Sequence, residues 1–333
     1  MKPKSTSVIL AAGQGTRMKS SLPKVLHQVA GKPMVWHALH TSSQVTNTNP
    51  VLIIGNGAER VQETVGDAAR FVMQEKRLGT GHAVMQAETL LRDQTDYVLV
   101  TSADMPLLTA ETLSTLLETQ IRNEDGPLTM LIVVNPNPRG FGRVVRGAAG
   151  EVLAIVEEAV ATNEQKKITE LNAGAYCFRA SWLWDALHRI ELSPKGEYYI
   201  TDLVAIAVRE GLRVAAHTTH DTAEAIGVNT RVHLSDAETA MRKRINAAWM
   251  NQGVTMIDPA TTYIDAEVIL APDIVLHPNT ILRGKTHIET GCEIGPNTTL
   301  DDVRVGAKSL LPHVSIRDKT LTPSTQLSPF TTL

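Results

Sequence analysis

The first two thirds of the chain alternate short apolar runs with longer segments of helical pattern. The apolar runs are rich in Val, Ile and Leu and cover residues 7–10, 51–55, 70–74, 97–104 and 128–134. The segments between them, such as GAERVQETVGDAA and GTGHAVMQAETLL, have the pattern of helices. Continuous apolar strands separated by helices predict a Rossmann-like α/β fold, in which a mixed, mostly parallel sheet is covered on both faces.

A different pattern begins after Pro259. Large aliphatic residues recur every six positions, and small or β-branched residues follow them four positions later. The aliphatic positions are Ile264, Leu270, Leu276, Leu282, Ile288, Ile294 and Leu300. This period predicts a short left-handed parallel β-helix with three hexapeptides per coil, so the regular repeats at about 264–305 supply two coils and a fraction. The phase is lost after Leu300, because Val305 stands one residue early.

These patterns predict three parts of the chain. Residues 1–231 form the α/β domain, and residues 232–258 form a connecting helix and linker. The helix is expected over 232–251, a segment without Gly or Pro. Residues 259–333 form the short β-helix and a Thr/Ser/Pro-rich tail, for which we expect either a cap on the open end of the β-helix or partial disorder.

Composition and charge exclude several classes of protein. The chain is 43% hydrophobic and 20% charged, as soluble globular proteins are. Its 4% aromatic content and net charge of -3 argue against a nucleic-acid partner. Two separate cysteines, Cys177 and Cys292, indicate a reducing compartment. No apolar stretch is long enough to span a membrane, and the run at 8–12 is too short for a signal peptide, so we expect a cytoplasmic protein.

A glycine-rich turn, AAGQGTRM, follows the first predicted strand. Gly13 and Gly15 allow backbone N–H groups to approach a ligand closely, and Arg17 and Lys24 add positive charge. These features suit a nucleoside triphosphate. The turn matches neither the dinucleotide-binding pattern, whose third glycine is replaced by Met18, nor the Walker phosphate loop. Taken alone, the turn has the alternative of a structural role without a ligand.

Several segments, in the same order along the chain, resemble the motifs of the sugar-nucleotide pyrophosphorylase family. LAAGQGTRMKSSLPKVL is similar to the signature L-x-x-G-x-G-T-R-M…P-K of that family. Further similar segments are QEKRLGTGHAV (74–84), SADMPL (102–107), GFGRVV (140–145), IVEE (155–158), ELNAG (170–174), GEYYITD (196–202) and GVNTR (227–231). The resemblance covers roughly residues 5–300 and is strongest to the bacterial uridylyltransferases that act on N-acetylglucosamine 1-phosphate.

The resemblance implies that residues 1–231 are a nucleotidyltransferase domain. In that reaction an oxygen of a sugar 1-phosphate attacks the α-phosphate of UTP in line, and pyrophosphate leaves. It implies Mg²⁺ as the cofactor, with Asp104 and Asn229 as its ligands, and it gives Arg17 and Lys24 the catalytic role of holding the triphosphate. The substrate-binding residues that it implies are Ala11, Gly13 and Gly15 at the nucleotide, Gln74, Gly79 and Thr80 at the uracil, Gly140, Glu157 and Asn172 at the sugar, and Tyr199 and Thr201 near the sugar phosphate.

Each of these positions also has a structural alternative. Asp104 has the alternative of a helix N-cap, Asn229 that of a turn residue, and Gln74 that of a solvated strand end. Glu157 belongs to a Glu pair, which is often a solvated sheet edge. The two histidines of HTTHD (217–221) suggest a metal pair, but no further ligand pattern follows, so we expect a surface loop there.

Three departures from the family pattern fall on the sugar side. Ser102-Ala103 replaces a Tyr-Gly pair, Ala159-Val160 replaces a Lys-Asp pair, and Ala173 replaces a threonine. The triphosphate side is intact, so the identity of the sugar stays open. An alternative function is that of a catalytically inert subunit, which binds a sugar nucleotide and regulates or scaffolds a partner.

The β-helix is shorter than in the two-activity members of the family. The later segments that bind acetyl-CoA in those members are absent, so we expect no acetyltransferase activity. The expected partners are small molecules, UTP and a sugar 1-phosphate. A homo-oligomer is an open possibility, and a trimer is uncertain because trimers of this family normally rely on the long β-helix.

Overall fold

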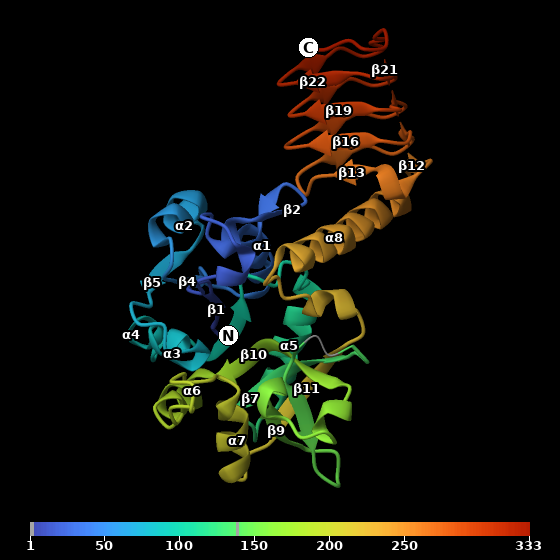
Figure 1. Cartoon of the computed structure of the whole chain (residues 1–333). Coiled ribbons are helices and arrows are strands. Elements are labelled where there is room, and N and C mark those ends of the chain that lie inside the picture. Colours follow the sequence, from blue (N-terminus) through green and yellow to red (C-terminus); the bar gives the residue numbers. More distant parts are fainter. Residues whose placement is uncertain (1–2, 138–139) are drawn as a thin grey trace. The chain divides into compact units, whose positions relative to one another are not determined.

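The computed structural model describes residues 3–137 and 140–333 and divides into two compact units (Figure 1). The first unit contains the chain up to His27 and Pro33–His233, and the second contains Gln28–Lys32 and Leu234–Leu333. The sequence patterns place the first boundary at residue 231, near the division after His233. They do not predict that residues 28–32 group with the second unit.

A mixed β-sheet forms the centre of the first unit. Its strands are β1 (Ser5–Leu10), β4 (Val51–Ile54), β5 (Arg70–Met73), β6 (Tyr97–Ser102), β7 (Leu128–Val134), β8 (Arg143–Arg146), β9 (Val152–Val156), β10 (Glu170–Arg179) and β11 (Val214–Thr219). The strand order is β11-β7-β10-β6-β1-β4-β5, with β8 and β9 attached beside β10. Strands β6, β1, β4 and β5 are parallel neighbours, whereas β10 is antiparallel to β6 and β7. The expected mixed, mostly parallel α/β fold is confirmed.

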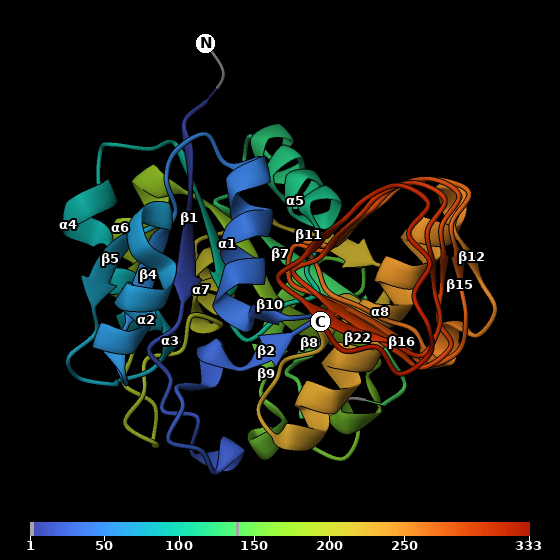
Figure 2. The ribbon, with the colours of Figure 1, turned by 90° about the horizontal axis from the view of Figure 1, so that it is seen from above.

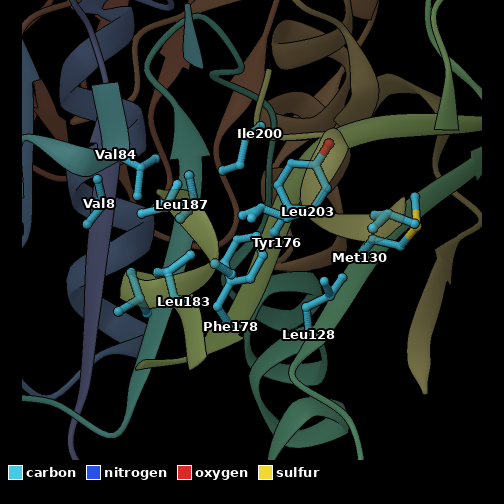
Figure 3. Close-up of a cluster of buried hydrophobic side chains, with 14 of the residues drawn as sticks. Val8, Val84, Leu128, Met130, Tyr176, Phe178, Leu183, Leu187, Ile200 and Leu203 are labelled. Atoms are coloured by element: carbon cyan, nitrogen blue, oxygen red, sulfur yellow. The ribbon is translucent and has the colours of Figure 1, made fainter. Parts of the chain in front are cut away.

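Helices bury both faces of this sheet. They are α1 (Met34–Val45), α2 (Ala58–Val65), α3 (Thr80–Met85), α4 (Glu88–Leu91), α5 (Ala110–Arg122), α6 (Ala180–Leu187) and α7 (Asp202–Arg209), with the 3₁₀ turns η1 (Thr16–Met18), η2 (Lys24–Leu26), η3 (Gly66–Ala68), η4 (Glu158–Val160), η5 (Gln165–Lys167) and η6 (Thr222–Ala225). Val8 packs in a cluster with residues of α3, α6 and α7, whereas the next residue, Ile9, packs with α1 and α2. Figure 3 shows the first cluster, with Tyr176 and Phe178 of β10 beside Leu183 of α6. Burial on both faces explains why the strands are continuously apolar.

The second unit is a parallel β-helix that follows helix α8 (Arg231–Asn251). Its three sheets are β12 (Thr255–Met256), β15 (Val275–Leu276), β18 (Glu293–Ile294) and β21 (Leu310–Leu311); β13 (Tyr263–Ile264), β16 (Thr280–Arg283), β19 (Thr298–Asp301) and β22 (Ser315–Arg317); and β14 (Ile269–Leu270), β17 (His287–Ile288), β20 (Arg304–Val305) and β23 (Thr320–Leu321). The turn η7 (Pro259–Thr261) precedes β13, and the strands β2 (Gln28–Val29) and β3 (Lys32–Pro33) form a hairpin. Figure 2 shows the coils of this unit overlying one another.

The coils continue beyond the range 264–305 that the six-residue period indicates. Tyr263 pairs with Ile281, and Ile281 pairs with Thr299, which corresponds to coils of 18 residues. Thr299 then pairs with Ser315, so the next coil is shorter. The sheets tolerate this loss because the missing residues come from the turns, while Leu311 and Ile316 still point inward and are buried. Residues Gln326 and Thr332 of the tail form further parallel bridges with the preceding coil.

Hydroxyl groups occupy several of the small inward positions of the β-helix. Thr280 Oγ1 donates to the carbonyl oxygen of His277 at 2.7 Å, and Thr298 Oγ1 donates to that of Leu311 at 2.8 Å. Both threonines are fully buried, so these bonds satisfy hydroxyl groups that have no access to water. Among the described residues, no helix is long and apolar enough to cross a membrane.

The inward aliphatic stack generates a stability prediction. Leu282 is 0% exposed in the core of the β-helix, and we expect Leu282→Ala to lower the free energy of unfolding by about 2–5 kcal/mol because a cavity remains. Denaturant unfolding measures the change. The control Ile269→Ala removes an aliphatic side chain that is 56% exposed and should cost less than about 1 kcal/mol. Equal losses in the two variants would contradict an inward-facing stack.

Candidate active site

A pocket of about 730 Å³ opens within the first unit, where strands β1, β5 and β6 end. The carboxyl ends of parallel strands are the usual place of ligand sites in open α/β sheets. Of the predicted site residues, those that line this pocket are Ala11, Gly13, Lys24, Gln74, Gly79, Thr80, Asp104, Gly140, Glu157, Asn172, Tyr199, Thr201 and Asn229. The fold therefore brings together side chains that are more than 200 positions apart in the chain.

Two of the predicted residues do not line this pocket. Arg17 is exposed and lines a neighbouring pocket of about 510 Å³, which shares Gly140 and Asn229 with the first. Gly15 lies against Lys24: its φ is 62°, and a Cβ on it would lie 2.7 Å from the Cβ of Lys24. Only glycine allows the chain to pass Lys24 so closely, so Gly15 acts on the pocket through the position of that lysine.

A cation lies between two oxygen atoms at one side of the pocket. The Lys24 ammonium group forms an ion pair with Asp104 Oδ2 and donates to Asn229 Oδ1 at 3.1 Å. The side chains of Lys24 and Asp104 are only 11% and 16% exposed. The backbone N–H of Val228 donates to the carbonyl oxygen of Asp104 at 2.8 Å, which joins the segment before α8 to the end of β6.

Asp104 does not have the structural role of a helix cap that the local sequence allows. Helix α5 begins at Ala110 with Thr109 as its N-cap, so Asp104 does not cap it. The turn that precedes Asn229 is held by Glu224, whose buried carboxylate accepts hydrogen bonds from Thr112 Oγ1 at 2.9 Å and from Thr109 N at 3.1 Å. This carboxylate fixes η6 against α5 and thereby positions the chain that carries Asn229.

The turn between β5 and α3 forms another wall of the pocket. Gln74 is 5% exposed, so it is not a solvated strand end, and its Nε2 donates to the carbonyl oxygen of Gly79 at 3.1 Å. Gly79 has a φ of 98°, and a Cβ there would lie 2.6 Å from the carbonyl oxygen of Tyr198. The backbone N–H of Ile200 donates to Thr80 Oγ1 at 3.1 Å. These contacts fix the turn to the segment before α7.

The remaining wall carries polar groups around Glu157. Burial raises the pKa of the Glu157 carboxyl group above its usual value, and a hydrogen bond from Thr201 Oγ1 at 3.4 Å partly opposes this shift. Asn172 lies at a bulge of β10, where its Oδ1 accepts hydrogen bonds from the Tyr176 hydroxyl at 2.9 Å and from Gly174 N at 3.2 Å. The amide nitrogen of Asn172 is thereby left for other partners.

The sequence patterns miss two charged residues of the pocket, Arg77 and Glu197. Both lie inside segments that resemble the family. Arg77 stands in QEKRLGTGHAV at a position where the motif leaves the residue type open, and Glu197 stands in GEYYITD. The signal that the sequence offered for these two residues was a charged side chain close to a glycine, Gly79 for Arg77 and Gly196 for Glu197.

The three departures from the family pattern fall at different distances from the pocket. Ser102 and Ala173 line it. Ala103 is fully buried in the core of the unit, and Ala159 and Val160 are exposed in η4 and do not line it. Among these replacements, therefore, only Ser102 and Ala173 alter the wall that a ligand would meet directly.

The two histidines of the HTTHD segment lie apart from this pocket. The expected surface loop is wrong at His217, which is half-buried in β11, and burial lowers the pKa of its imidazole. Within residues 3–137 and 140–333, no group of three or more His, Cys, Asp or Glu side chains is arranged to hold a metal ion. One carboxylate and one amide, as at Asp104 and Asn229, do not form such a group.

Comparison with known proteins gives first the class and then the relatives. Residues 7–175 match the MobA-like NTP transferase domain family. The chain is 42% identical over 329 residues to the bifunctional protein GlmU of Heliobacterium modesticaldum, an alignment that covers 98% of this chain and 71% of that protein. It is 44% identical over 326 residues to the bifunctional protein GlmU of Exiguobacterium sibiricum, covering 97% and 72%.

These matches, together with a pocket at the strand ends, define an NTP transferase. The chain belongs to the family of the bifunctional GlmU proteins, whose lengths it covers to about 71%. The resemblance described from the motifs is thus confirmed at the level of the family.

The raised pKa of Glu157 generates a prediction about stability and pH. Burial makes the charged form of Glu157 unfavourable in the folded state, so its pKa is higher in the folded than in the unfolded protein. The free energy of unfolding of the wild type therefore falls as pH rises between these two pKa values, and it stays lower at higher pH. We therefore expect Glu157→Gln to raise Tm at about pH 8, with a gain that shrinks as pH is lowered toward about 4.5. Thermal unfolding across that pH range measures the gain. The control Glu63→Gln, at an exposed position of α2, should show no such trend. A gain in the Glu157→Gln variant that does not depend on pH would contradict the assignment.

Proposed function

We propose that the chain is a sugar-1-phosphate nucleotidyltransferase, which forms a UDP-sugar and pyrophosphate from UTP and a sugar 1-phosphate. The acceptor that we propose is N-acetylglucosamine 1-phosphate. The observation that carries this proposal is the convergence of Lys24, Asp104 and Asn229 in a pocket that Glu157 and Asn172 also line. A volume of about 730 Å³ leaves room for a nucleotide and a sugar phosphate together.

The reaction needs positive charge more than it needs a covalent catalyst. An oxygen of the sugar phosphate bonds to the α-phosphorus of UTP while the bond from that phosphorus to the β-phosphate oxygen breaks, so two anions meet and charge grows on pyrophosphate. Lys24 and Arg77 supply cations inside the pocket, and Arg17 supplies one in the adjoining pocket. Fixed cations of this kind lower the barrier because they are in place before charge develops.

The residues around Lys24 fit a magnesium ion. Asp104 and Asn229 present a carboxylate and a carbonyl oxygen toward the Lys24 ammonium group, and this preference for positive charge supports a cation site beside them. One or two protein oxygens are what Mg²⁺ usually takes beside phosphates and water. When bound, the ion would neutralise phosphate oxygens and the charge that develops on them.

The polar groups around Glu157 and Asn172 suit a sugar phosphate. The Glu157 carboxylate accepts hydrogen bonds from sugar hydroxyls, and the amide nitrogen of Asn172 donates to a sugar oxygen. Thr201 and Tyr199 would lie near the phosphate, and the backbone of Gly140 at the sugar. Gln74, Gly79 and Thr80 would contact the base, Ala11 and Gly13 would lie along the nucleotide, and Gly15 would act through the position of Lys24. The absence of acetyltransferase activity in this chain, its oligomeric state and its cytoplasmic location stay predictions.

The catalytic role of the metal-side carboxylate is tested by one isosteric substitution. Asp104→Asn retains the size of the side chain and a hydrogen-bond acceptor for Lys24, but it removes the negative charge. We expect kcat to fall on the order of 10²–10³-fold at temperatures where the variant stays folded, and Tm to fall as well because the shielded Lys24 ammonium group loses its anionic partner. Steady-state release of pyrophosphate measures kcat. The exposed Asp67→Asn is the control, and retained activity in the Asp104→Asn variant would rule out the assignment.

The substrates are tested by pyrophosphate release with Mg²⁺ and a panel of nucleotides and sugar 1-phosphates. We expect release with UTP and N-acetylglucosamine 1-phosphate. Release with a different sugar only would identify the acceptor and point to Ser102 and Ala173, which line the pocket, as the cause. The alternative of an inert binding subunit instead predicts that UTP raises Tm while no pair of substrates releases pyrophosphate.

A further inference from the structure

The orientation of the Gln74 side-chain amide is fixed by its surroundings. One of its terminal atoms lies 3.1 Å from the backbone carbonyl oxygen of Gly79. A carbonyl oxygen only accepts hydrogen bonds, so the atom that faces it must be the amide nitrogen, Nε2. The side chain is 5% exposed, so little water competes for this contact.

The second hydrogen on this nitrogen points to His82. Nε2 of Gln74 lies 3.0 Å from Nδ1 of His82, and an amide nitrogen is only a donor, so Nδ1 must be an unprotonated acceptor. The other ring nitrogen lies 3.4 Å from Nε2 of Gln86, which already donates to the backbone oxygen of His82 at 3.0 Å. The shorter contact with Gln74 therefore decides the tautomer. Burial lowers the pKa of His82, and the charge of Lys76 lowers it further, which favours the neutral ring.

With both amide hydrogens engaged, Gln74 presents only its oxygen to a ligand. Oε1 forms no hydrogen bond with the described part of the chain, and Gln74 lines the pocket. The pocket thus offers a fixed acceptor and no donor from this side chain. At the centre of the pairing edge uracil and thymine carry an N3–H donor, whereas cytosine carries an unprotonated N3 acceptor there and has its only donor on that edge at the 4-amino group.

We propose that His82 is a positioning residue, which holds the Gln74 amide so that the pocket selects a pyrimidine with an N3–H donor over cytosine. The inference rests on the proposed function, because it takes Gln74 to contact the base. His82 does not line the pocket itself and acts through Gln74. A site built to hydrogen-bond one edge rejects a ligand that lacks the matching group, since polar groups on both sides are then left unpaired.

The test compares the dissociation constants of UTP and CTP by calorimetry, without a sugar phosphate. Wild-type protein should bind UTP at least about 100-fold more tightly than CTP. His82→Phe keeps a ring beside Tyr198, whose centroid is 6.4 Å away, but removes the acceptor at Nδ1. In this variant the carbonyl oxygen of Gly79 alone still holds the Gln74 amide. With one of its two acceptors lost, the amide is held less firmly, and the UTP/CTP ratio should fall below about 10-fold through weaker UTP binding and stronger CTP binding.

Matched variants separate this role from a general structural one. His82→Asn places an amide oxygen where Nδ1 stood and should retain the wild-type ratio. His82→Gln has no acceptor there. If His82→Phe does not fold, His82→Gln takes its place in the test and should show the same loss of selectivity. Gln86→Ala removes the other neighbour of the ring and should leave the ratio unchanged.

The outcomes of the binding and turnover experiments are distinct. A wild-type ratio near one, a ratio that survives His82→Phe or His82→Gln, or no binding of either nucleotide overturns the role of His82. Selective binding that is lost in His82→Phe and restored in His82→Asn supports it, whether or not pyrophosphate is released. Absence of pyrophosphate release with selective binding intact would overturn the proposed function alone.

Discussion

The rest of the pocket depends on one interaction, the contact of the Lys24 ammonium group with Asp104 and Asn229. A cation that is largely shielded from water needs anionic or polar partners, and here Asp104 and Asn229 supply them. Because these partners follow β6 and η6, one lysine joins three segments that are distant in the chain. The same arrangement supplies a point where a metal ion and phosphate oxygens would meet, so the stability of the pocket and its proposed chemistry share one set of charges.

Close approaches of the backbone at two glycines hold two turns of the pocket in place. Gly15 lets the turn after β1 pass the Lys24 side chain, and Gly79 lets the turn between β5 and α3 contact the backbone of Tyr198. Neither position has room for a Cβ. Behind these turns, the buried carboxylate of Glu224 fixes η6 through hydroxyl and backbone donors. The pocket is therefore shaped mainly by backbone placement, and the side chains that face the ligand are oriented afterwards by local hydrogen bonds such as that of Gln74.

The β-helix follows a different rule, because its register depends on inward side chains and not on turn length. Coils of 18 residues give way to shorter coils after Thr299, but Leu311 and Ile316 stay in the core. Counting six-residue steps therefore underestimates the number of coils, since the count fails at the first shortened turn. The packed aliphatic stack does not fail there, because a turn on the surface loses a residue at little cost.

The sequence by itself determined the apolar strands and the glycine turn, because periodicity and turn chemistry are local properties of the chain. The resemblance of its motifs indicated the family and thirteen of the thirty residues that line the pocket. Only the tertiary structure decided that Arg17 lies in the adjoining pocket, that Arg77 and Glu197 line the main one, and that the coils continue past residue 305. It also decided that the Gln74 amide nitrogen meets the Gly79 carbonyl oxygen and the His82 ring. These features depend on contacts between distant segments, such as the 3.1 Å hydrogen bond from Lys24 to Asn229, and no local pattern specifies which donor will meet which acceptor across such a separation.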